Sequence, residues 1–220
     1  MAGRAFLISV SQIRILMMRW TRSRAALLGA FIGLTTVAIS AEQALPPPPD
    51  SIKDKLATCL VCHGPGGVSQ MEGAPSLAAS PDLFLEWQLV YFRGQTRKND
   101  MMTPAVADLT DDDIRNFGAY FASLPPPPAP AAPDANPELT AKGEKIVRDR
   151  HCSQCHLPNL VGGLEAPRLA GQHEEYIVKA LHDYQHNERR GRGNVIMPEL
   201  AYAMSEDDIH AIAHYVSRLP

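Results

Sequence analysis

Cys59-Leu60-Val61-Cys62-His63 is a five-residue stretch that returns as Cys152-Ser153-Gln154-Cys155-His156, and the two copies contain all four cysteines of the chain. Each copy has the pattern C-x-x-C-H, which is typical of covalent attachment of a c-type haem. Two thiols three residues apart lie on nearly the same side of a helical turn, so both reach the vinyl groups of one porphyrin. The histidine that follows is placed to ligate the iron. The chain is therefore predicted to carry two covalently bound haem c groups.

The four cysteines also fit two other interpretations. Two C-x-x-C pairs also bind a single structural zinc, and each pair is compatible with a redox dithiol or a disulfide. The pairs are farther apart in sequence than in most zinc sites, and a dithiol does not need the histidine that follows each pair. These two points favour haem.

The first 41 residues have the order of a secretory signal peptide. Five arginines and no acidic residue precede Ala41, and an apolar run from Ala25 to Ile39 leads to the small residues Ser40 and Ala41. The run is shorter than the roughly 20 residues that cross a bilayer. Cleavage and a periplasmic location are predicted, with an uncleaved anchor as the alternative.

The charge of the chain indicates the kind of partner. The formal net charge is −3, and without the five leader arginines 16 basic residues face 24 acidic ones, a net charge of −8. Such a surface does not favour nucleic acid. It favours redox protein partners with a basic docking patch, membrane-bound respiratory complexes among them, and no small-molecule substrate is predicted.

Two proline-rich segments divide the chain, one with four consecutive prolines and one with seven prolines in thirteen residues. Such segments form stiff, extended spacers and do not enter a core. The expected parts are a signal peptide (1–41), a spacer (42–49), a first haem domain (50–124), a linker (125–137) and a second haem domain (138–220).

Helical periodicity predicts an all-α fold for both domains. Ser80, Thr110, Thr140 and Ser205 are the expected N-caps of four helices, because their hydroxyls accept hydrogen bonds from free backbone N–H groups. Ser80 precedes a proline, and Thr110 and Ser205 precede acidic residues that suit the positive end of a helix. Domains of about 80 residues have small cores, so a haem would form the centre of each.

The second half of the chain repeats the first. Ala166-Pro167-Arg168-Leu169 matches Ala74-Pro75-Ser76-Leu77 at an offset of 92 residues, and Leu219-Pro220 matches Leu124-Pro125 at an offset of 95. The same helical domain is therefore expected twice.

The repeat selects one methionine in each half as the second axial ligand. At the offset of 95, Met102 matches Met197, whereas Met101 matches Ile196. Met204 falls on a leucine, which indicates an apolar packing position. Met102 and Met197 are thus the predicted sulfur ligands, each in a loop with a proline within two residues.

The second half also contains histidines without counterparts in the first. They are expected on surfaces and helix faces, and His/His ligation of the second haem is the alternative to Met197. A backbone carbonyl near Pro75 or Pro167 would accept the Nδ1–H of the proximal histidine and fix its orientation. A plain turn proline is the alternative.

Over residues 50–220 the chain resembles the dihaem class I cytochromes c of the cytochrome c4 type. The resemblance is carried by the two C-x-x-C-H motifs, Gly143-Glu144-Lys145, Ala166-Pro167-Arg168-Leu169-Ala170-Gly171-Gln172-His173, Met102-Thr103-Pro104, Met197, Leu109-Thr110-Asp111-Asp112-Asp113-Ile114 and Ser205-Glu206-Asp207-Asp208-Ile209.

The resemblance implies two tandem cytochrome c domains, each a small helical fold around a covalent haem. It also implies haems that face each other across a domain interface, with His63 and Met102 as one axial pair and His156 and Met197 as the other. The chain departs from the family where no glycine lies within residues 50–58. Ser51 or Ala57 would replace it, or the first and last helices of the domain would cross less closely.

The expected function is electron transfer without catalytic residues, between a quinol-oxidising complex or a dehydrogenase and a terminal oxidase or reductase. A dedicated haem subunit of a dehydrogenase is the first alternative. A dihaem peroxidase is the second, and it would need one haem with an open axial position.

Overall fold

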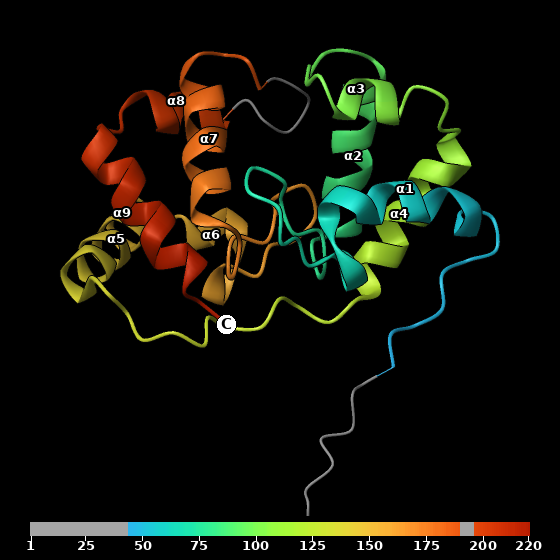
Figure 1. Ribbon diagram of the computed structural model, residues 1–220. Helices are drawn as coiled ribbons and strands as arrows, with labels where there is room; N and C mark the ends of the chain where they lie inside the picture. The colour runs from blue at the N-terminus through green and yellow to red at the C-terminus, as the bar shows by residue number, and fades with distance from the viewer. Residues whose placement is uncertain (1–43, 190–195) are drawn as a thin grey trace, which may run out of the picture. The chain divides into compact units, whose positions relative to one another are not determined.

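The computed structural model describes residues 44–189 and 196–220. The predicted signal peptide and part of the Arg/Gly-rich segment before Met197 lie outside these ranges. The described residues are helical and form no strand beyond one isolated bridge between Gly163 and Ala166 (Figure 1).

The helices fall into two groups, here called the first lobe (residues 50–124) and the second lobe (residues 137–220). The first lobe contains α1 (Lys53–His63), a 3-10 turn η1 (Pro65–Gly67), α2 (Asp82–Arg93), α3 (Met102–Ala105) and α4 (Asp111–Ser123). The second lobe contains α5 (Pro137–Asp149), α6 (Ser153–His156), a 3-10 turn η2 (Pro158–Leu160), α7 (Glu174–Gln185), α8 (Ile196–Tyr202) and α9 (Glu206–Ser217).

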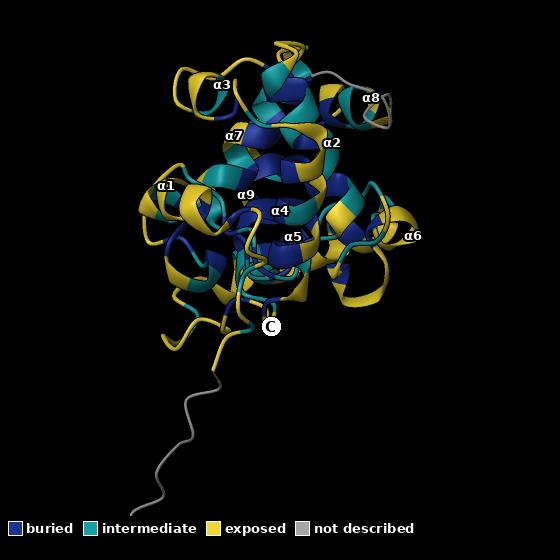
Figure 2. Cartoon of the chain, turned by 90° about the vertical axis from the view of Figure 1, so that its right-hand side faces the viewer, coloured by how far each residue is buried: buried dark blue, intermediate teal, exposed yellow. Residues whose placement is uncertain are grey.

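Each lobe has its own apolar core. The first centres on Ile52 and Phe117, and the second on Ile209 and Val216, all at most 1% exposed. Buried positions gather on α2, α4, α7 and α9, whereas α3 and α8 are mostly exposed or half-buried (Figure 2). The predicted all-α fold is confirmed.

Two of the four predicted helix caps are confirmed and two are wrong. Thr110 and Asp113 form a reciprocal capping box at the start of α4, and Ser205 accepts the N–H of Asp208 at the start of α9. In contrast, Pro81 and not Ser80 is the N-cap of α2. Helix α5 begins at the cap Asn136, because an Asn-Pro pair at the end of the proline-rich segment supplies both a cap and a first helical residue.

The second lobe packs its first and last helices with almost no space between the backbones. A Cβ built on Gly143 of α5 would lie 2.0 Å from the carbonyl oxygen of Ala211 in α9. Only a residue without a side chain permits this crossing.

The first lobe has no such close crossing, and polar side chains join α1 to α4 instead. Asn116 donates to the Ser51 hydroxyl at 2.9 Å, and Lys55 Nζ lies 2.5 Å from Asp113 Oδ2. Hydrogen bonds from Lys55 and Thr110 lower the pKa of Asp113 to about 2. Of the two arrangements left open by the sequence, replacement of the glycine by Ser51 or Ala57 and a looser crossing, the structure shows the looser crossing.

The loops that follow the two C-x-x-C-H motifs join the lobes to each other (Figure 1). The Gln172 side chain accepts from the Ser76 backbone N–H and donates to the Ser76 carbonyl, both at 2.9 Å. His173 Nε2 donates to the Ser69 carbonyl at 3.0 Å. The two lobes accordingly belong to one compact unit.

The proline-rich linker is fastened to the second lobe. Arg218 donates to the Ala132 carbonyl at 3.0 Å, and Asp134 lies 3.1 Å from His214 Nε2. His214 Nδ1 lies 3.0 Å from Glu174 on the other side of the ring. The imidazole thus bridges the linker and α7.

Replacing Gly143 by alanine should destabilise the second lobe. The added Cβ forces α5 and α9 apart, which should cost about 3 kcal/mol, more than the roughly 1 kcal/mol that alanine gains over glycine inside a helix. Chemical denaturation of the haem-loaded protein would measure the loss. Gly94→Ala is the control, because Gly94 has a negative φ and a Cβ built on it would lie 3.2 Å from the Val90 carbonyl oxygen. Equal stability of the two variants would contradict the proposed contact.

The contact between the linker and the second lobe should weaken as the pH rises. Burial alone would lower the pKa of His214, but hydrogen bonds to Asp134 and Glu174 outweigh it and raise that pKa above 6.5. Because the pKa of His214 is higher in the folded than in the unfolded protein, the histidine stabilises the fold fully at any pH below its unfolded-state pKa. This stabilisation is lost as the pH rises through the folded-state pKa. The free energy of unfolding of the wild type, minus that of His214→Gln, should therefore fall above pH 6.5. If the difference between the two unfolding free energies were constant between pH 6 and 9, the proposed role of His214 would be wrong.

Candidate haem-binding sites

The first motif lies wholly within a helix. Helix α1 runs through Cys59 and Cys62 and ends at His63, which is 6% exposed. The chain then reverses at Gly64, whose φ is +75° and whose added Cβ would lie 2.0 Å from the Val68 carbonyl oxygen. Glycine at this position lets the loop fold back under the histidine. Helix α1 therefore carries the whole motif up to His63.

The second motif reaches the same arrangement by a different path. Helix α5 ends before the motif, His151 adopts a positive φ, and the short helix α6 carries Cys155 and His156. The turn after His156 places Leu157 at φ +62°, where the first lobe has glycine. A non-glycine residue in this region is strained by about 1 kcal/mol or more, so the second lobe keeps the turn at a cost in stability.

Both histidines are held by the same hydrogen bond. His63 Nδ1 lies 2.8 Å from the Pro75 carbonyl oxygen, and His156 Nδ1 lies 2.8 Å from the Pro167 carbonyl oxygen. A carbonyl can only accept, so Nδ1 carries the proton and Nε2 keeps its lone pair for a metal. The predicted carbonyl partners are confirmed, and the plain turn proline is excluded.

The protein environment favours the neutral form of both imidazoles. Burial lowers the pKa of His63 and of His156, and the hydrogen bonds to the proline carbonyls oppose this without reversing it. Neutral imidazole is the form that binds iron. Each lobe therefore presents one buried ring nitrogen as a ligand.

The four cysteines form no disulfide within the described residues. Cys59, Cys62 and Cys152 are half-buried and Cys155 is exposed. Among residues 44–189 and 196–220, no three histidine, cysteine or acidic side chains group as a metal site. Since the two pairs belong to separate lobes, the single zinc site is not formed.

The two predicted methionines occupy short helices, where loops had been expected. Met102 is the first residue of α3, and Asn99 Oδ1 accepts the backbone N–H of Met101 at 3.0 Å and of Met102 at 2.9 Å. Met197 is the second residue of α8 and packs, like Cys152, against the second core.

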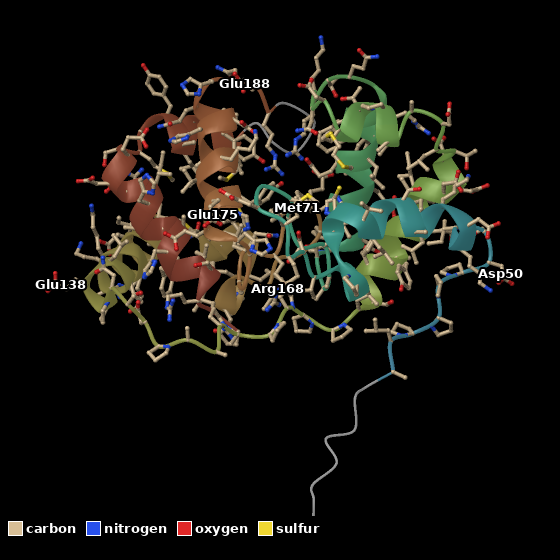
Figure 3. The ribbon with its side chains drawn as sticks, viewed as in Figure 1. Asp50, Met71, Glu138, Arg168, Glu175 and Glu188 are labelled. Carbon is tan, nitrogen blue, oxygen red and sulfur yellow. The ribbon has the colours of Figure 1, made fainter. Side chains whose placement is uncertain are left out.

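Met102 and Met197 are less exposed than the residues that precede them in the sequence. Met102 and Met197 are half-buried, whereas Met101 is 69% exposed and Ile196, its partner in the repeat, is 54% exposed. Met204 is buried in the second core, as the packing assignment predicts. Met71 is 46% exposed and lies in the loop between the groups of helices (Figure 3).

The remaining histidines of the second lobe are surface residues or have other partners. His173 and His214 form the contacts described above, and His182 lies 3.0 Å from Glu206. His186 and His210 are exposed. These positions agree with the expected surface and helix-face roles.

Sequence reasoning missed a buried polar cluster between the lobes. Arg97 and Arg189 are 9% and 3% exposed, and both lie near Gln88 and Tyr176. The repeat pairs these two residues, because Arg189 follows Arg97 at the offset of 92 already seen at Ala74 and Ala166, but this offset does not report their burial.

The donor set of each lobe fits a haem c. Each lobe offers two thiols for thioether bonds and one imidazole nitrogen for iron, and it has a half-buried thioether on a separate short helix. This is the ligand chemistry of a c-type haem with histidine and methionine as axial ligands.

The comparisons with known proteins define the class. The Cytochrome c family model matches residues 140–220. Cytochrome c4 of Azotobacter vinelandii is 34% identical over 184 residues, which cover 75% of this chain and 86% of that protein. The crystal structure of reduced recombinant cytochrome c4 from Pseudomonas stutzeri aligns with a TM-score of 0.70 and 31% identity, covering 79% of this chain and 100% of that one. A thiosulfate dehydrogenase electron acceptor of Thiomonas intermedia is 29% identical over 206 residues, which cover 90% of this chain and 92% of that protein.

The fold, the two motifs and the family match make this protein a c-type cytochrome with covalently bound haem c. Within that class, the chain belongs to the cytochrome c4 family. The predictions of the family, of the helical fold and of two covalent haems are confirmed.

Proposed function

We propose that this protein is a periplasmic carrier of single electrons. It takes them from a quinol-oxidising complex or a dehydrogenase and passes them to a terminal oxidase or reductase. In this proposal Cys59 and Cys62 attach the first haem and Cys152 and Cys155 the second. The axial pairs are His63 with Met102 and His156 with Met197.

The observation that carries the proposal is the duplicated ligand set. In each lobe the Nδ1 hydrogen bond to a proline carbonyl directs Nε2 of one imidazole toward a metal, and the repeat supplies one half-buried methionine. A haem with both axial positions filled changes its iron oxidation state without binding a substrate. This supports a carrier, and it argues against the peroxidase alternative, which needs an open position.

The surface charge supports a basic partner. Acidic residues start both α4 and α9, at Asp111–Asp113 and Glu206–Asp208, and the segment after the predicted signal peptide is strongly acidic overall. Association with a basic docking patch would be accelerated by this charge and slowed by salt.

The periplasmic location rests on the predicted signal peptide and on the chemistry of haem c attachment. Within residues 44–189 and 196–220, no helix has the length and apolar character to cross a membrane. The leader itself lies outside the described residues.

A dedicated subunit of a dehydrogenase is the second candidate. It is favoured by the similarity to the thiosulfate dehydrogenase electron acceptor of Thiomonas intermedia over nearly the whole chain. The two candidates share the haem sites and differ in whether the protein leaves its electron donor.

The methionine assignments can be tested with matched pairs. Met102→Leu should remove about half of the sulfur–iron charge-transfer absorbance of the oxidised protein and lower one haem potential, because thioether ligation raises it. Met197→Leu should remove the other half. Met101→Leu and Met204→Leu are the controls and should leave the band unchanged. A full band in Met102→Leu would refute its ligation.

The carrier role can be tested by electron exchange in solution. The purified protein should be reduced by quinol-oxidising membranes of its own organism, separate from them on centrifugation, and be reoxidised by an isolated oxidase or reductase. Both rates should fall as salt rises. Stable co-purification with a dehydrogenase, without exchange in solution, would establish the dedicated-subunit alternative.

A further inference from the structure

The loop that follows the second haem motif, residues 157–164, has a strained backbone. Among the residues that the structure describes, eight that are not glycine have a positive φ, and four of these lie in this loop. They are Leu157, Asn159, Leu160 and Leu164, with φ between +53° and +62°. Backbone strain of this kind clusters at functional sites, so each of the four needs an explanation.

The first lobe makes the same turns with glycine. The two motifs are 93 residues apart, and at this offset Leu157, Asn159 and Leu160 match the three glycines of the segment 64–67. All three glycines have a positive φ, between +63° and +75°. The backbone path is therefore shared by both lobes, and the second lobe adds side chains to it where glycine would be free of strain.

Burial or intrinsic preference explains two of the four residues. Leu160 is 2% exposed and belongs to the second core, and asparagine accepts a positive φ more readily than most side chains. Neither reason applies to Leu157 and Leu164, whose side chains are 42% and 78% exposed. Val161 between them is also exposed, whereas its counterpart Val68 packs against the first core. The loop therefore holds three apolar side chains at the surface, two of them against backbone strain.

Hydrogen bonds fix the positions of these side chains. Leu164 stands at the tip of a tight turn that is closed by two hydrogen bonds between Gly163 and Ala166, at 2.9 Å and 3.0 Å. A Cβ built on Gly163 would lie 2.6 Å from Leu157 Cδ1, so the Leu157 side chain lies against the same turn. A third hydrogen bond, from the loop backbone to the His156 carbonyl at 2.8 Å, ties the loop to the proposed iron ligand. A surface held in place in this way loses little conformational entropy when a partner binds.

The surface around these side chains carries no charge. The stretch 152–164 contains no lysine, arginine, aspartate or glutamate, whereas these residues make up 20% of the whole chain. Cys155, a proposed attachment point of the second haem, is exposed within this stretch. Electron transfer requires two redox centres to come close, and an uncharged apolar surface beside a haem attachment point suits such a contact.

The charge of the rest of the chain selects among the possible occupants of this surface. Residues 42–220 contain 16 basic and 24 acidic residues, a net charge of −8. A second copy of the chain and an anionic membrane are therefore repelled. A redox protein with an overall basic surface is attracted by the net charge, and an apolar face on that protein then contacts the uncharged loop.

We propose that Leu157, Val161 and Leu164 form the docking surface through which the second haem exchanges electrons with a redox protein. This partner has an apolar face at its redox centre within an overall basic surface. The proposal rests on the carrier function proposed above and deepens it, because it assigns one of the two partners of the carrier to the second lobe.

The test uses the double variant Leu157→Gly/Leu164→Gly of the haem-loaded full chain. Glycine keeps the backbone path and removes the apolar surface, so the haem spectrum and both potentials should be unchanged. Stopped-flow absorbance would measure reduction by quinol-oxidising membranes and reoxidation by an isolated oxidase. One of these two second-order rate constants should fall about tenfold, as for loss of an apolar anchor buried on binding, whereas reduction by dithionite should be unaffected.

The dependence on salt separates apolar contact from attraction between charges. The factor of loss should be the same at low and high ionic strength, because the loop carries no charge. A loss seen only at low salt would overturn the apolar contact, and so would unchanged rates with both partners.

The matched control is Met71→Gly in the first lobe. Met71 is the counterpart of Leu164 at the offset of 93 and is 46% exposed, and its replacement should leave both rates unchanged. An equal loss in this control would overturn the assignment to the second lobe. Leu164→Asn is a second variant, because asparagine tolerates the positive φ, and it should lower the same rate as the double variant.

Two further measurements detect other occupants of the surface, and either would overturn the proposal. The first is sedimentation of the wild type as a dimer and of the double variant as a monomer. The second is binding of the wild type to phosphatidylglycerol vesicles that the double variant loses. A wild type that exchanges electrons with neither membranes nor oxidase would refute the carrier function alone. The loop is then tested on the co-purifying dehydrogenase, which the double variant should no longer retain, and retention would overturn the docking surface as well.

Discussion

The hydrogen bond from a histidine Nδ1 to a proline carbonyl is the constraint around which both lobes are arranged. To make it, the chain must reverse directly after the motif and bring a proline eleven or twelve residues later under the ring. Gly64 permits this reversal in the first lobe, and Leu157 performs it under strain in the second. Retention of the turn despite this cost indicates that the orientation of the imidazole matters more than local backbone stability.

The two lobes hold the histidine with the same hydrogen bond, but their helices pack differently. The second relies on Gly143 and a backbone crossing, whereas the first uses Lys55, Asp113 and a looser crossing. The first lobe carries the motif on one continuous helix, and the second breaks the helix before it. Packing has diverged freely between the copies, while the histidine, the proline carbonyl and the arginine have not.

The two haem-attachment motifs were recognisable in the sequence because covalent attachment demands a fixed local spacing, and the repeat selects Met102 over Met101 as the proposed ligand. The start of α5 was not predictable from the sequence, because Asn136 and Pro137 continue the composition of the proline-rich linker. The burial of Arg97 and Arg189 was not predictable either. It depends on the opposite lobe, about 90 residues away in sequence, and no local pattern reports such a contact.

Gln172 has a consequence for how the lobes separate. Its amide pairs with both backbone groups of Ser76, as one peptide group pairs with another in a β-ladder. Such pairing has no intermediate register, because sliding by one residue would break both hydrogen bonds and leave buried groups unsatisfied. The lobes are therefore expected to dock in an all-or-none equilibrium, without a continuum of partly opened states, so a partner protein meets a single fixed spacing between the two redox centres.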